Sequence, residues 1–476
     1  MDTLKFYSDG TWVDPQCKET LDVTNPSTEM SVATISMANF EDADLAVQAA
    51  RTAWESWSQT SVEERLTLLR RLLEIYSERS EEMAEAISNE MGAPITFSRN
   101  LQVAFGYNHL KNTITALEKF QFEHPLNEDS DDSQLMHEPI GVAALITPWN
   151  WPMNQVMLKV APALATGCTL VLKPSQVAPL SSMVLADMVD QAGFPAGVFN
   201  LINGAGSSVG SYLCRHPEVD VVSFTGSTGA GASITRDTSE GIKRVSLELG
   251  GKGANLVFPD ADKASVRNSI ERCFRNTGQS CNAPTRLLVE RSILDETIEL
   301  AVTAANEMEV GAADKEGSHI GPVASKSQYD KVRSLIEIGV KEGATLKAGG
   351  LDRPDGLNQG WFIKPTVFAD VTPDMTIAKE EIFGPVLSIM AFDSEEEAIA
   401  LANDTEYGLT NYIQTSDSER ARRIARRLRS GMVEVNCKPF GPGFPFGGYK
   451  KSGNGREGGR FGLEEFLEVK VVSDWA

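Results

Sequence analysis

One cysteine in this chain of 476 residues has neighbours suited to covalent chemistry. Cys281 lies in the polar run Gln279–Asn282, which follows a predicted helix and precedes a predicted strand. A thiolate in such a loop can attack a carbonyl carbon and form a covalent tetrahedral intermediate. We interpret the remaining cysteines as packing residues, the commonest role of a free thiol: Cys17, Cys168, Cys214, Cys273 and Cys437.

A carboxylate stands where another predicted strand ends. Apolar and polar residues alternate over Val245–Gly250, which places Glu248 at the end of a strand and at the mouth of a sheet. A glutamate in such a place is most often a surface residue. The pair Gly250-Gly251 that follows makes a plain strand end less convincing. Glu248 is therefore a candidate functional residue.

Two glycine-rich turns are candidates for a phosphate site. Gly204–Gly210 is one residue too long for the dinucleotide pattern GxGxxG, and Gly226–Gly231 has its glycines in another order. Taken alone, either is more often a tight turn. The second is better placed, because a buried strand precedes it and a helix can begin at Thr228. Backbone N–H groups and the Ser227 hydroxyl would then meet a pyrophosphate.

The elements that must position these groups alternate between strands and helices. Short apolar runs predict strands at 140–146, 169–172, 198–202, 219–224 and 244–247, with helices beginning near Met153, Pro179 and Ser207. Such a pattern indicates a parallel sheet covered on both faces, which binds ligands at the carboxyl ends of its strands. A second α/β stretch follows, with strands at 254–258 and 286–289 and a helix at 262–276.

Helices dominate the first third of the chain. We predict helices at 41–57 and 101–119, and a long one that a capping box at Ser61–Glu64 opens and Gly92 ends. The acidic segment 123–133 is predicted to be an exposed turn or a protruding arm. Partial alternation over 465–472 predicts a last strand.

Composition excludes several classes of protein. The net charge of −22, from 44 basic and 66 acidic residues, repels nucleic acid and anionic membranes. An arginine-rich helix at 420–429 is the exception, with Ile424 and Leu428 facing inward and its guanidiniums in solvent. The cysteines are scattered, and we see no leader or apolar run of membrane-spanning length, which predicts a cytoplasmic protein. No two histidines have the spacing of a metal-binding motif, which predicts a protein without a metal.

Five short motifs carry a resemblance that covers essentially the whole chain. In order and spacing they are similar to those of the aldehyde dehydrogenase superfamily: Thr147–Pro152 (TPWNWP), Leu247–Lys252 (LELGGK), Gly278–Ala283 (GQSCNA), Glu381–Val386 (EIFGPV) and Pro445–Lys450 (PFGGYK). Any one could be coincidence, whereas five in register are specific. The resemblance implies NAD(P)-dependent oxidation of an aldehyde to a carboxylic acid, through a thiohemiacetal and a thioester on a cysteine.

The resemblance also implies an α/β architecture in three parts. A Rossmann-like parallel-sheet cofactor domain comprises 1–120 and 139–250, and a second α/β catalytic domain comprises 251–450. A small β oligomerisation element comprises 121–138 and 451–476. A homodimer or homotetramer is the expected assembly, and a small-molecule aldehyde is the expected partner.

Catalytic roles follow from the motifs that match. Cys281 matches the nucleophile, and Asn150 matches the side-chain donor to the oxyanion, although an asparagine between prolines is usually only a turn residue. Glu248 matches the general base that activates water to hydrolyse the thioester. Lys159 and Glu457 match a pair suggested to relay protons away from that base.

Cofactor contacts follow in the same way. Lys173 matches a ligand of the adenosine-side ribose and Glu381 one of the nicotinamide-side ribose, while Gly226 and Ser227 match pyrophosphate contacts. Phe383 matches a residue that flanks the nicotinamide. The further expected cofactor contacts are Thr147, Trp149, Ser175 and Gln176. Three aromatic residues match the lining of the substrate tunnel: Trp151, Phe440 and Phe446.

Three positions depart from the common pattern. Gln176 replaces a carboxylate that many members carry, which removes repulsion of a 2′-phosphate and predicts appreciable use of NADP, alone or beside NAD. Gly229 makes the Gly-Ser-Thr loop more flexible. Lys438, two residues before Phe440, places a cation near the tunnel mouth and predicts a preference for semialdehyde acids.

Other functions remain open at this point. A coenzyme-A-acylating dehydrogenase would release the acyl group to a thiol instead of water, and Glu248 argues against it. A non-catalytic binding protein could reuse the fold, but both the cysteine and the glutamate are present. A cysteine hydrolase would need a histidine partner for Cys281, and none is evident.

Overall fold

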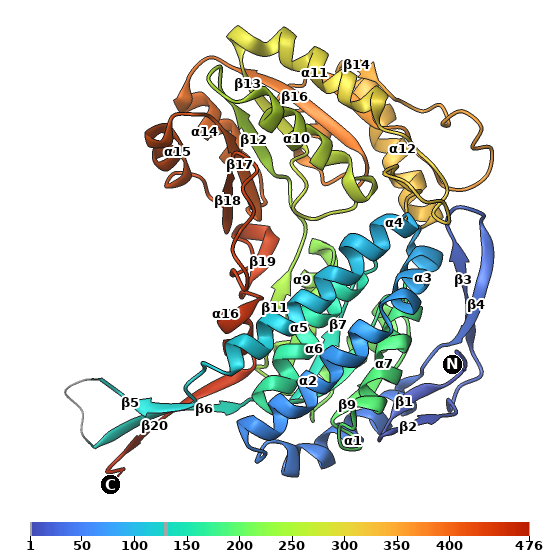
Figure 1. Cartoon of the computed structure of the whole chain (residues 1–476), viewed down its shortest axis with the longest axis vertical. Helices are drawn as coiled ribbons and strands as arrows, with labels where there is room; N and C mark the ends of the chain where they lie inside the picture. Colours follow the sequence, from blue (N-terminus) through green and yellow to red (C-terminus); the bar gives the residue numbers. More distant parts are fainter. Residues whose placement is uncertain (1, 128–131, 476) are drawn as a thin grey trace.

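The computed structural model describes residues 2–127 and 132–475. Two large, mostly parallel sheets dominate it, one in each half of the molecule, and a small third sheet extends from its side (Figure 1). This arrangement confirms the α/β fold class.

The first large sheet has eight strands, and its five central strands are parallel. Its order is β19 (Gly453–Asn454), β11 (Arg244–Glu248), β10 (Val221–Thr225), β7 (Val142–Ile146), β8 (Thr169–Lys173), β9 (Phe199–Leu201), β1 (Phe6–Ser8) and β2 (Thr11–Val13). Each predicted strand of this region is confirmed to within about two residues at each end.

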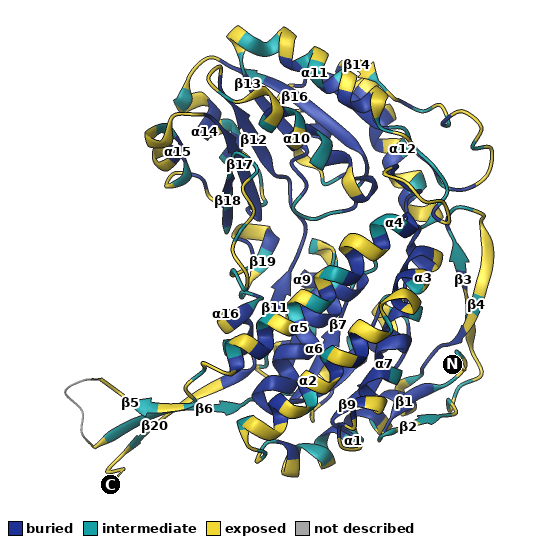
Figure 2. Ribbon diagram, in the orientation of Figure 1, coloured by how far each residue is buried: buried dark blue, intermediate teal, exposed yellow. Residues whose placement is uncertain are grey.

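Helices cover both faces of this sheet, and alternate strand residues point to opposite cores. Ala143 and Leu145 of β7 pack with one group of helices, whereas Val142 and Ala144 pack with the other. The first group is α2 (Val62–Glu78), α3 (Ser80–Met91), α5 (Val103–Leu117), α6 (Pro152–Thr166) and α7 (Leu180–Ala192). The second is α1 (Phe40–Trp57), α8 (Ser211–Arg215) and α9 (Thr228–Thr238). Figure 2 shows the strands buried between helices whose outer faces are exposed.

The long helix predicted from Ser61 to Gly92 is in fact two helices. The capping box is confirmed, because Ser61 accepts from the Glu64 backbone and the Glu64 carboxylate accepts from that of Ser61. Gly92 ends α3 in a left-handed conformation. Arg79, with φ of −105° and ψ of 21°, breaks the helix between α2 and α3. Its guanidinium reaches Asp187 of α7 at 2.6 Å.

The second large sheet has seven strands, and only its edge strand β14 is antiparallel. Its order is β14 (Thr345–Ala348), β15 (Thr366–Ala369), β16 (Val386–Phe392), β13 (Arg286–Glu290), β12 (Ala254–Val257), β17 (Thr410–Gln414) and β18 (Met432–Val435). Its helices are α10 (Lys263–Phe274), α11 (Leu294–Glu307), α12 (Lys326–Lys341), α13 (Thr376–Lys379), α14 (Glu395–Asn403) and α15 (Ser418–Ala425).

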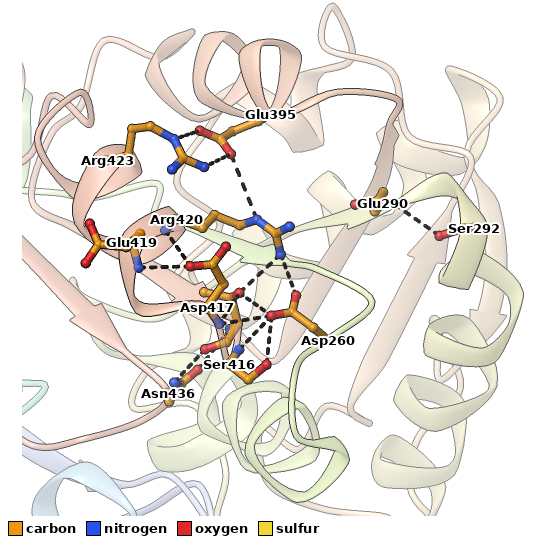
Figure 3. A network of polar contacts seen from close by, with 11 residues as sticks. Asp260, Glu290, Ser292, Glu395, Ser416, Asp417, Glu419, Arg420, Arg423 and Asn436 are labelled. Carbon is orange, nitrogen blue, oxygen red and sulfur yellow. Dashed lines mark hydrogen bonds and ion pairs between the residues drawn. The ribbon is translucent and has the colours of Figure 1, made fainter.

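The arginine-rich segment is helical only to Ala425, where α15 ends, and is therefore shorter than predicted; its guanidiniums are also not simply solvated. Ile424 and Leu428 are buried as predicted. Arg420 pairs with Asp260, which also accepts from the Ser416 hydroxyl (Figure 3). Further pairs join Arg423 to Glu395, Arg427 to Glu396 and Arg422 to Glu419. These ion pairs thus fasten the segment to Asp260, which follows β12, and to α14.

The third sheet is antiparallel and protrudes from the body (Figure 1). It consists of β5 (Glu123–Pro125), β6 (Ser133–Pro139) and β20 (Leu467–Ser473), with β20 at one edge. The predicted arm therefore begins and ends in strands, and residues 128–131 of it lie outside the described residues. A separate hairpin joins β3 (Thr20–Asn25) to β4 (Met30–Ser36).

The remaining elements are short. They are α4 (Ile95–Phe97), the π-helix η1 (Ser98–Gln102), the π-turn η2 (Gly206–Gly210), the 3-10 turns η3 (Arg275–Gly278), η4 (Arg291–Ile293) and η5 (Lys450–Ser452), and α16 (Gly459–Glu464). Within the described ranges, every helix is too short or too polar to cross a membrane.

Candidate active site

The loop that carries Cys281 begins with a run of left-handed residues. After α10, Asn276, Thr277 and Gly278 have φ values of 52°, 57° and 69°. A Cβ at Gly278 would lie 2.0 Å from the carbonyl oxygen of Gly384, so the close approach requires glycine here. The Gln279 side chain donates to the Asn276 carbonyl at 3.0 Å and accepts from the Ala324 backbone at 2.8 Å. The loop is therefore held on both sides.

Asn150 joins this loop from the end of β7. It is buried, and its Nδ2 donates to the Gln279 carbonyl oxygen at 3.0 Å. The neighbouring Trp151 donates its indole N–H to the Ser280 hydroxyl at 2.8 Å. The structure thus brings an amide donor to the same loop as the cysteine, as the sequence predicts.

Cys281 lies against the glycine pair that follows β11. A Cβ at Gly251 would lie 2.2 Å from the Cys281 carbonyl oxygen, so only glycine permits this approach. Burial raises the pKa of the Cys281 thiol above its ordinary value, and the Glu381 and Glu248 carboxylates raise it further. The thiol is therefore neutral at rest, and its activation needs a proton acceptor.

Glu248 ends β11 as predicted, but it is buried and not at the surface. Neither of its carboxylate oxygens has a hydrogen-bond partner within the described residues. Burial raises its pKa well above the ordinary value, and the nearby Glu457 raises it further. A carboxyl group whose pKa is raised in this way is a stronger base than a glutamate in solvent.

Lys159 and Glu457 form a buried ion pair beside Glu248. Lys159 also donates to the Ser223 hydroxyl at 3.1 Å. Glu457 exchanges two backbone hydrogen bonds of 2.8 Å with Phe446, which ties the Pro445–Lys450 motif to this pair. The two predicted relay residues therefore touch each other, and their charges act on Glu248.

The carboxyl ends of β7, β8 and β10 form one polar edge. The hydroxyls of Thr147 and Thr225 are buried there without a hydrogen-bond partner among the described residues. Lys173 donates to the carbonyls of Pro174 and Gly204 at 2.9 and 3.0 Å, and burial lowers its pKa to about 8. Unsatisfied hydroxyls and a buried amine fit the hydroxyls and phosphates of a dinucleotide.

The second glycine turn leads into a helix at this edge. Ser227 caps α9 and accepts from the Ala230 backbone at 3.3 Å, and Gly226 directly follows β10. Ser175 accepts from the Val177 backbone at 3.2 Å, and Gln176 is exposed. The N-terminus of α9 thus presents backbone N–H groups where the sequence predicts a pyrophosphate.

Glu381 lies near the Cys281 loop, and two aromatic residues of the predicted cofactor site contact each other. The Glu381 carboxylate accepts from the Gly251 backbone at 2.8 Å, and burial raises its pKa. Phe383, with a left-handed φ of 60°, meets Trp149 edge to face at 5.4 Å between ring centroids. These residues fit the nicotinamide end of the dinucleotide.

The predicted substrate residues fall into two aromatic groups. Trp151 packs against Phe97 and Phe105 at 5.5 and 5.4 Å between centroids. Phe440 and Phe446 both pack against Phe444, at 4.8 and 6.3 Å. The sequence prediction did not include Phe97, Phe105 and Phe444, because they lie outside the five motifs. The backbone N–H of Lys438 donates to the Val435 carbonyl at 3.1 Å, and this lysine is exposed.

Together these features fit a nicotinamide-dependent dehydrogenase. Its cysteine loop meets an amide donor, a buried carboxyl group and an edge suited to a dinucleotide. All six cysteines are free. Across residues 2–127 and 132–475, no three His, Cys, Asp or Glu residues are grouped to hold a metal ion.

Comparison with known proteins gives the family. The model of the aldehyde dehydrogenase family matches residues 12–472. A 3-succinoylsemialdehyde-pyridine dehydrogenase of a Pseudomonas species is 49% identical over 473 residues, covering 99% of this chain and 98% of the relative. The chain belongs to the aldehyde dehydrogenase family.

Solved structures agree. The aldehyde dehydrogenase of Bartonella henselae has a TM-score of 0.99 and 53% identity, covering 99% of both chains. A cysteine-to-alanine variant of aldehyde dehydrogenase C from Pseudomonas syringae, in complex with NAD+ and octanal, has a TM-score of 0.97 and 46% identity, covering 100% of this chain and 97% of the other. The prediction of an NAD(P)-dependent oxidoreductase acting on aldehydes is confirmed.

Proposed function

We propose that Cys281 is the nucleophile with which this enzyme oxidises an aldehyde to a carboxylic acid. The observation that carries the proposal is that the Asn150 amide contacts the Cys281 loop while the unpartnered Glu248 carboxyl acts on the same thiol. Glu248 accepts the thiol proton or a proton of water. The Asn150 side chain and the Cys281 backbone N–H stabilise the oxyanion.

The chemistry balances with these groups. The Cys281 sulfur adds to the carbonyl carbon and forms a thiohemiacetal. The nicotinamide, when bound, supplies a hydride acceptor, so that a thioester remains on Cys281. Glu248 then takes a proton from water, whose oxygen attacks the thioester carbon, and the acid leaves as the thiol is restored. Lys159 and Glu457 relay the proton taken by Glu248 away from it.

We assign the dinucleotide to the polar edge of the eight-stranded sheet. Lys173, Ser175 and Gln176 contact the adenosine ribose, and Thr147 and Trp149 lie along the cofactor. Gly226 and Ser227 contact the pyrophosphate, and Glu381 and Phe383 contact the nicotinamide end. The buried, unpartnered Thr147 hydroxyl supports this assignment.

For the substrate we propose an aldehyde whose chain packs on the aromatic residues Trp151, Phe440 and Phe446. A similar protein is named for a pyridine semialdehyde, and another was crystallised with octanal. Lys438 is proposed to favour a distal carboxylate. A panel that compares semialdehyde acids with neutral aldehydes of equal length, on the wild type and on Lys438→Ala, measures this preference as a ratio of KM values.

The three sheets correspond to the three parts that we assign to the chain. We propose that 1–120 and 139–250 form the cofactor domain, 251–450 the catalytic domain, and 121–138 with 451–476 the oligomerisation element of a homodimer or homotetramer. Within 451–476, β19 pairs with β11 of the eight-stranded sheet, and β20 is the strand that lies in the third sheet. The exposed edge strand β20 supports the last assignment. We propose a cytoplasmic location, which the free thiols support.

The test is the variant Cys281→Ala. We expect it to lose aldehyde oxidation while it still binds NAD+, as followed by quenching of tryptophan fluorescence, with Cys273→Ala as the control that keeps its activity. Retained turnover would remove the mechanism. Product analysis with and without coenzyme A separates hydrolysis from acyl transfer, and we expect free acid under both conditions.

A further inference from the structure

A glutamine outside the five motifs contacts Asn150, the residue proposed to bind the oxyanion. Gln102 is the last residue of the π-helix η1, between α4 and α5, and it is fully buried. A π-helix places its side chains out of register with the α-helix that follows, and such turns are common at functional sites. Here the change of register brings Gln102 to residues far from it in the chain.

The Gln102 side chain contacts two of those residues. Its Nε2 lies 3.3 Å from the Asn150 carbonyl oxygen and 3.3 Å from Asn276 Oδ1. Both partners are acceptors, which fixes the orientation of the carboxamide, because the flipped amide would face two oxygens with an oxygen.

Two further amides close the network. Asn276 Nδ2 donates to the Asn150 carbonyl at 2.8 Å and to the Gln279 carbonyl at 3.2 Å. Asn150 Nδ2 donates to the same Gln279 carbonyl at 3.0 Å. We call Gln102, Asn150, Asn276 and Gln279 the carboxamide cluster. All four side chains are buried.

We propose that Gln102 is a positioning residue that aims the Asn150 amide at the oxyanion. The proposal rests on the function assigned to Asn150 above. An amide nitrogen has two N–H groups, so Asn150 can keep its bond to Gln279 and donate the other to the substrate oxygen. The side-chain amides of Gln102 and Asn276 both donate to the Asn150 carbonyl oxygen, and these bonds fix the direction of that second N–H.

The expected effect is moderate. Loss of an oxyanion donor itself slows catalysis by about 10²–10³-fold. Removal of the two neutral hydrogen bonds that Gln102 donates, which only steady the oxyanion donor, corresponds to about tenfold in rate. The variant Gln102→Met keeps the length of the side chain and removes the donor. We expect the first-order rate of the NADH burst, per titrated Cys281 thiol, to fall about tenfold.

Iodoacetamide distinguishes positioning of the donor from general damage to the loop. It alkylates a thiol without forming an oxyanion, so its rate with Cys281 should change less than about twofold in Gln102→Met. Hydrolysis of p-nitrophenyl acetate forms an oxyanion without hydride transfer, so it should slow together with the burst. Equal losses in all three rates, or no loss in the burst, would overturn the proposal.

Three further variants complete the test. Gln102→Glu puts a carboxylate against two acceptors, so the burst should slow more above pH 8 than at pH 6, where a protonated carboxyl can donate again. In the Asn150→Ala background, Gln102→Met should have no further effect. Gln414→Leu removes an equally buried glutamine of β17 and controls for loss of stability, since it should leave the burst rate unchanged. Additive losses with Asn150→Ala would contradict the proposal, whereas turnover by Cys281→Ala would instead contradict the function on which it rests.

Discussion

Glu248 is the buried carboxyl group to which we assign proton transfer. Its oxygens have no partner within the described residues, and burial with the adjacent Glu457 raises its pKa well above the ordinary value. A glutamate in solvent would be too weak a base to activate water efficiently at neutral pH. The same burial that is unfavourable for the Glu248 carboxylate therefore makes it the stronger base that the proposed hydrolysis needs.

We predict that Glu248→Gln separates hydride transfer from hydrolysis. The amide cannot accept a proton from water, so the thioester should accumulate. Stopped-flow absorbance should show at most one equivalent of reduced cofactor, followed by steady-state turnover that is slower by about 10²-fold or more. Glu465→Gln, which changes a nearby partly buried glutamate, is the control and should retain turnover. An unchanged steady-state rate in Glu248→Gln would remove it from the catalytic residues.

Gln176 is predicted to widen the choice of cofactor. Its side chain is exposed after β8, two residues beyond the Lys173–Pro174 turn. A carboxylate there would repel a 2′-phosphate by roughly 1 kcal/mol or more. We expect Gln176→Glu to lower kcat/KM for NADP+ by about fivefold or more and to change that for NAD+ little. Strong discrimination against NADP+ in the wild type, unchanged by the glutamate, would place the cause elsewhere in the loop.

Residues in motifs could be found from the sequence, and those joined only by folding could not. Cys281, Glu248 and Asn150 stand in short runs whose composition marks them. Gln102 stands 48 residues from Asn150 and 174 from Asn276, in a stretch that only predicts helix. Periodicity cannot show that a π-turn rotates its side chain into the interior.

At the scale of elements, boundaries were harder to predict than the elements themselves. Strand positions agree because buried parallel strands are continuous apolar runs. The helix from Ser61 to Gly92 is interrupted at Arg79, whose guanidinium pairs with Asp187, a tertiary contact that no local pattern contains. The helix predicted to continue to Asn276 ends at Phe274, since the left-handed turn that follows serves the Cys281 loop.

One buried carboxyl group of α3 makes the stability of the protein depend on pH. Glu90 of α3 is fully buried and accepts from the Ser181 backbone at 3.2 Å and from that of Leu180, at the start of α7. Burial raises its pKa to about 7. A raised acidic pKa means that the folded state holds the proton more tightly than the unfolded one. Its contribution to stability is therefore present below about pH 4.5 and is lost as the pH rises through about 7.

We predict that Glu90→Gln removes this dependence. Between pH 5 and pH 8 the free energy of unfolding of the wild type should fall by roughly 3 kcal/mol relative to the variant. Urea denaturation at several pH values measures the difference. Glu85→Gln, at an exposed position of the same helix, is the control. Parallel pH curves for the wild type and Glu90→Gln would show that Glu90 does not titrate in this range.

At the scale of the whole molecule, the protruding sheet is the feature that a single chain leaves incomplete. β20 lies at the edge of the sheet, so one side of its backbone is unpaired within it. Val469 and Val471 are 59% and 56% exposed, and they share one face of the strand. An exposed edge strand with an apolar face invites pairing with another chain. The alternation of the sequence predicted this strand, but not which of its faces stays exposed.

We predict that the double variant V469K/V471K shifts the protein toward monomers. Two charges on the face that pairs with another copy would be costly to bury, because neither has a counter-charge there. Sedimentation velocity at a few micromolar should show a dimer or tetramer for the wild type and a slower species for the variant. Val32→Lys places a charge on the exposed strand β4 and should leave the assembly unchanged. The burst amplitude per chain should survive in the variant, because Cys281, Glu248 and Asn150 all belong to one chain. A variant that sediments like the wild type would assign the interface to another surface.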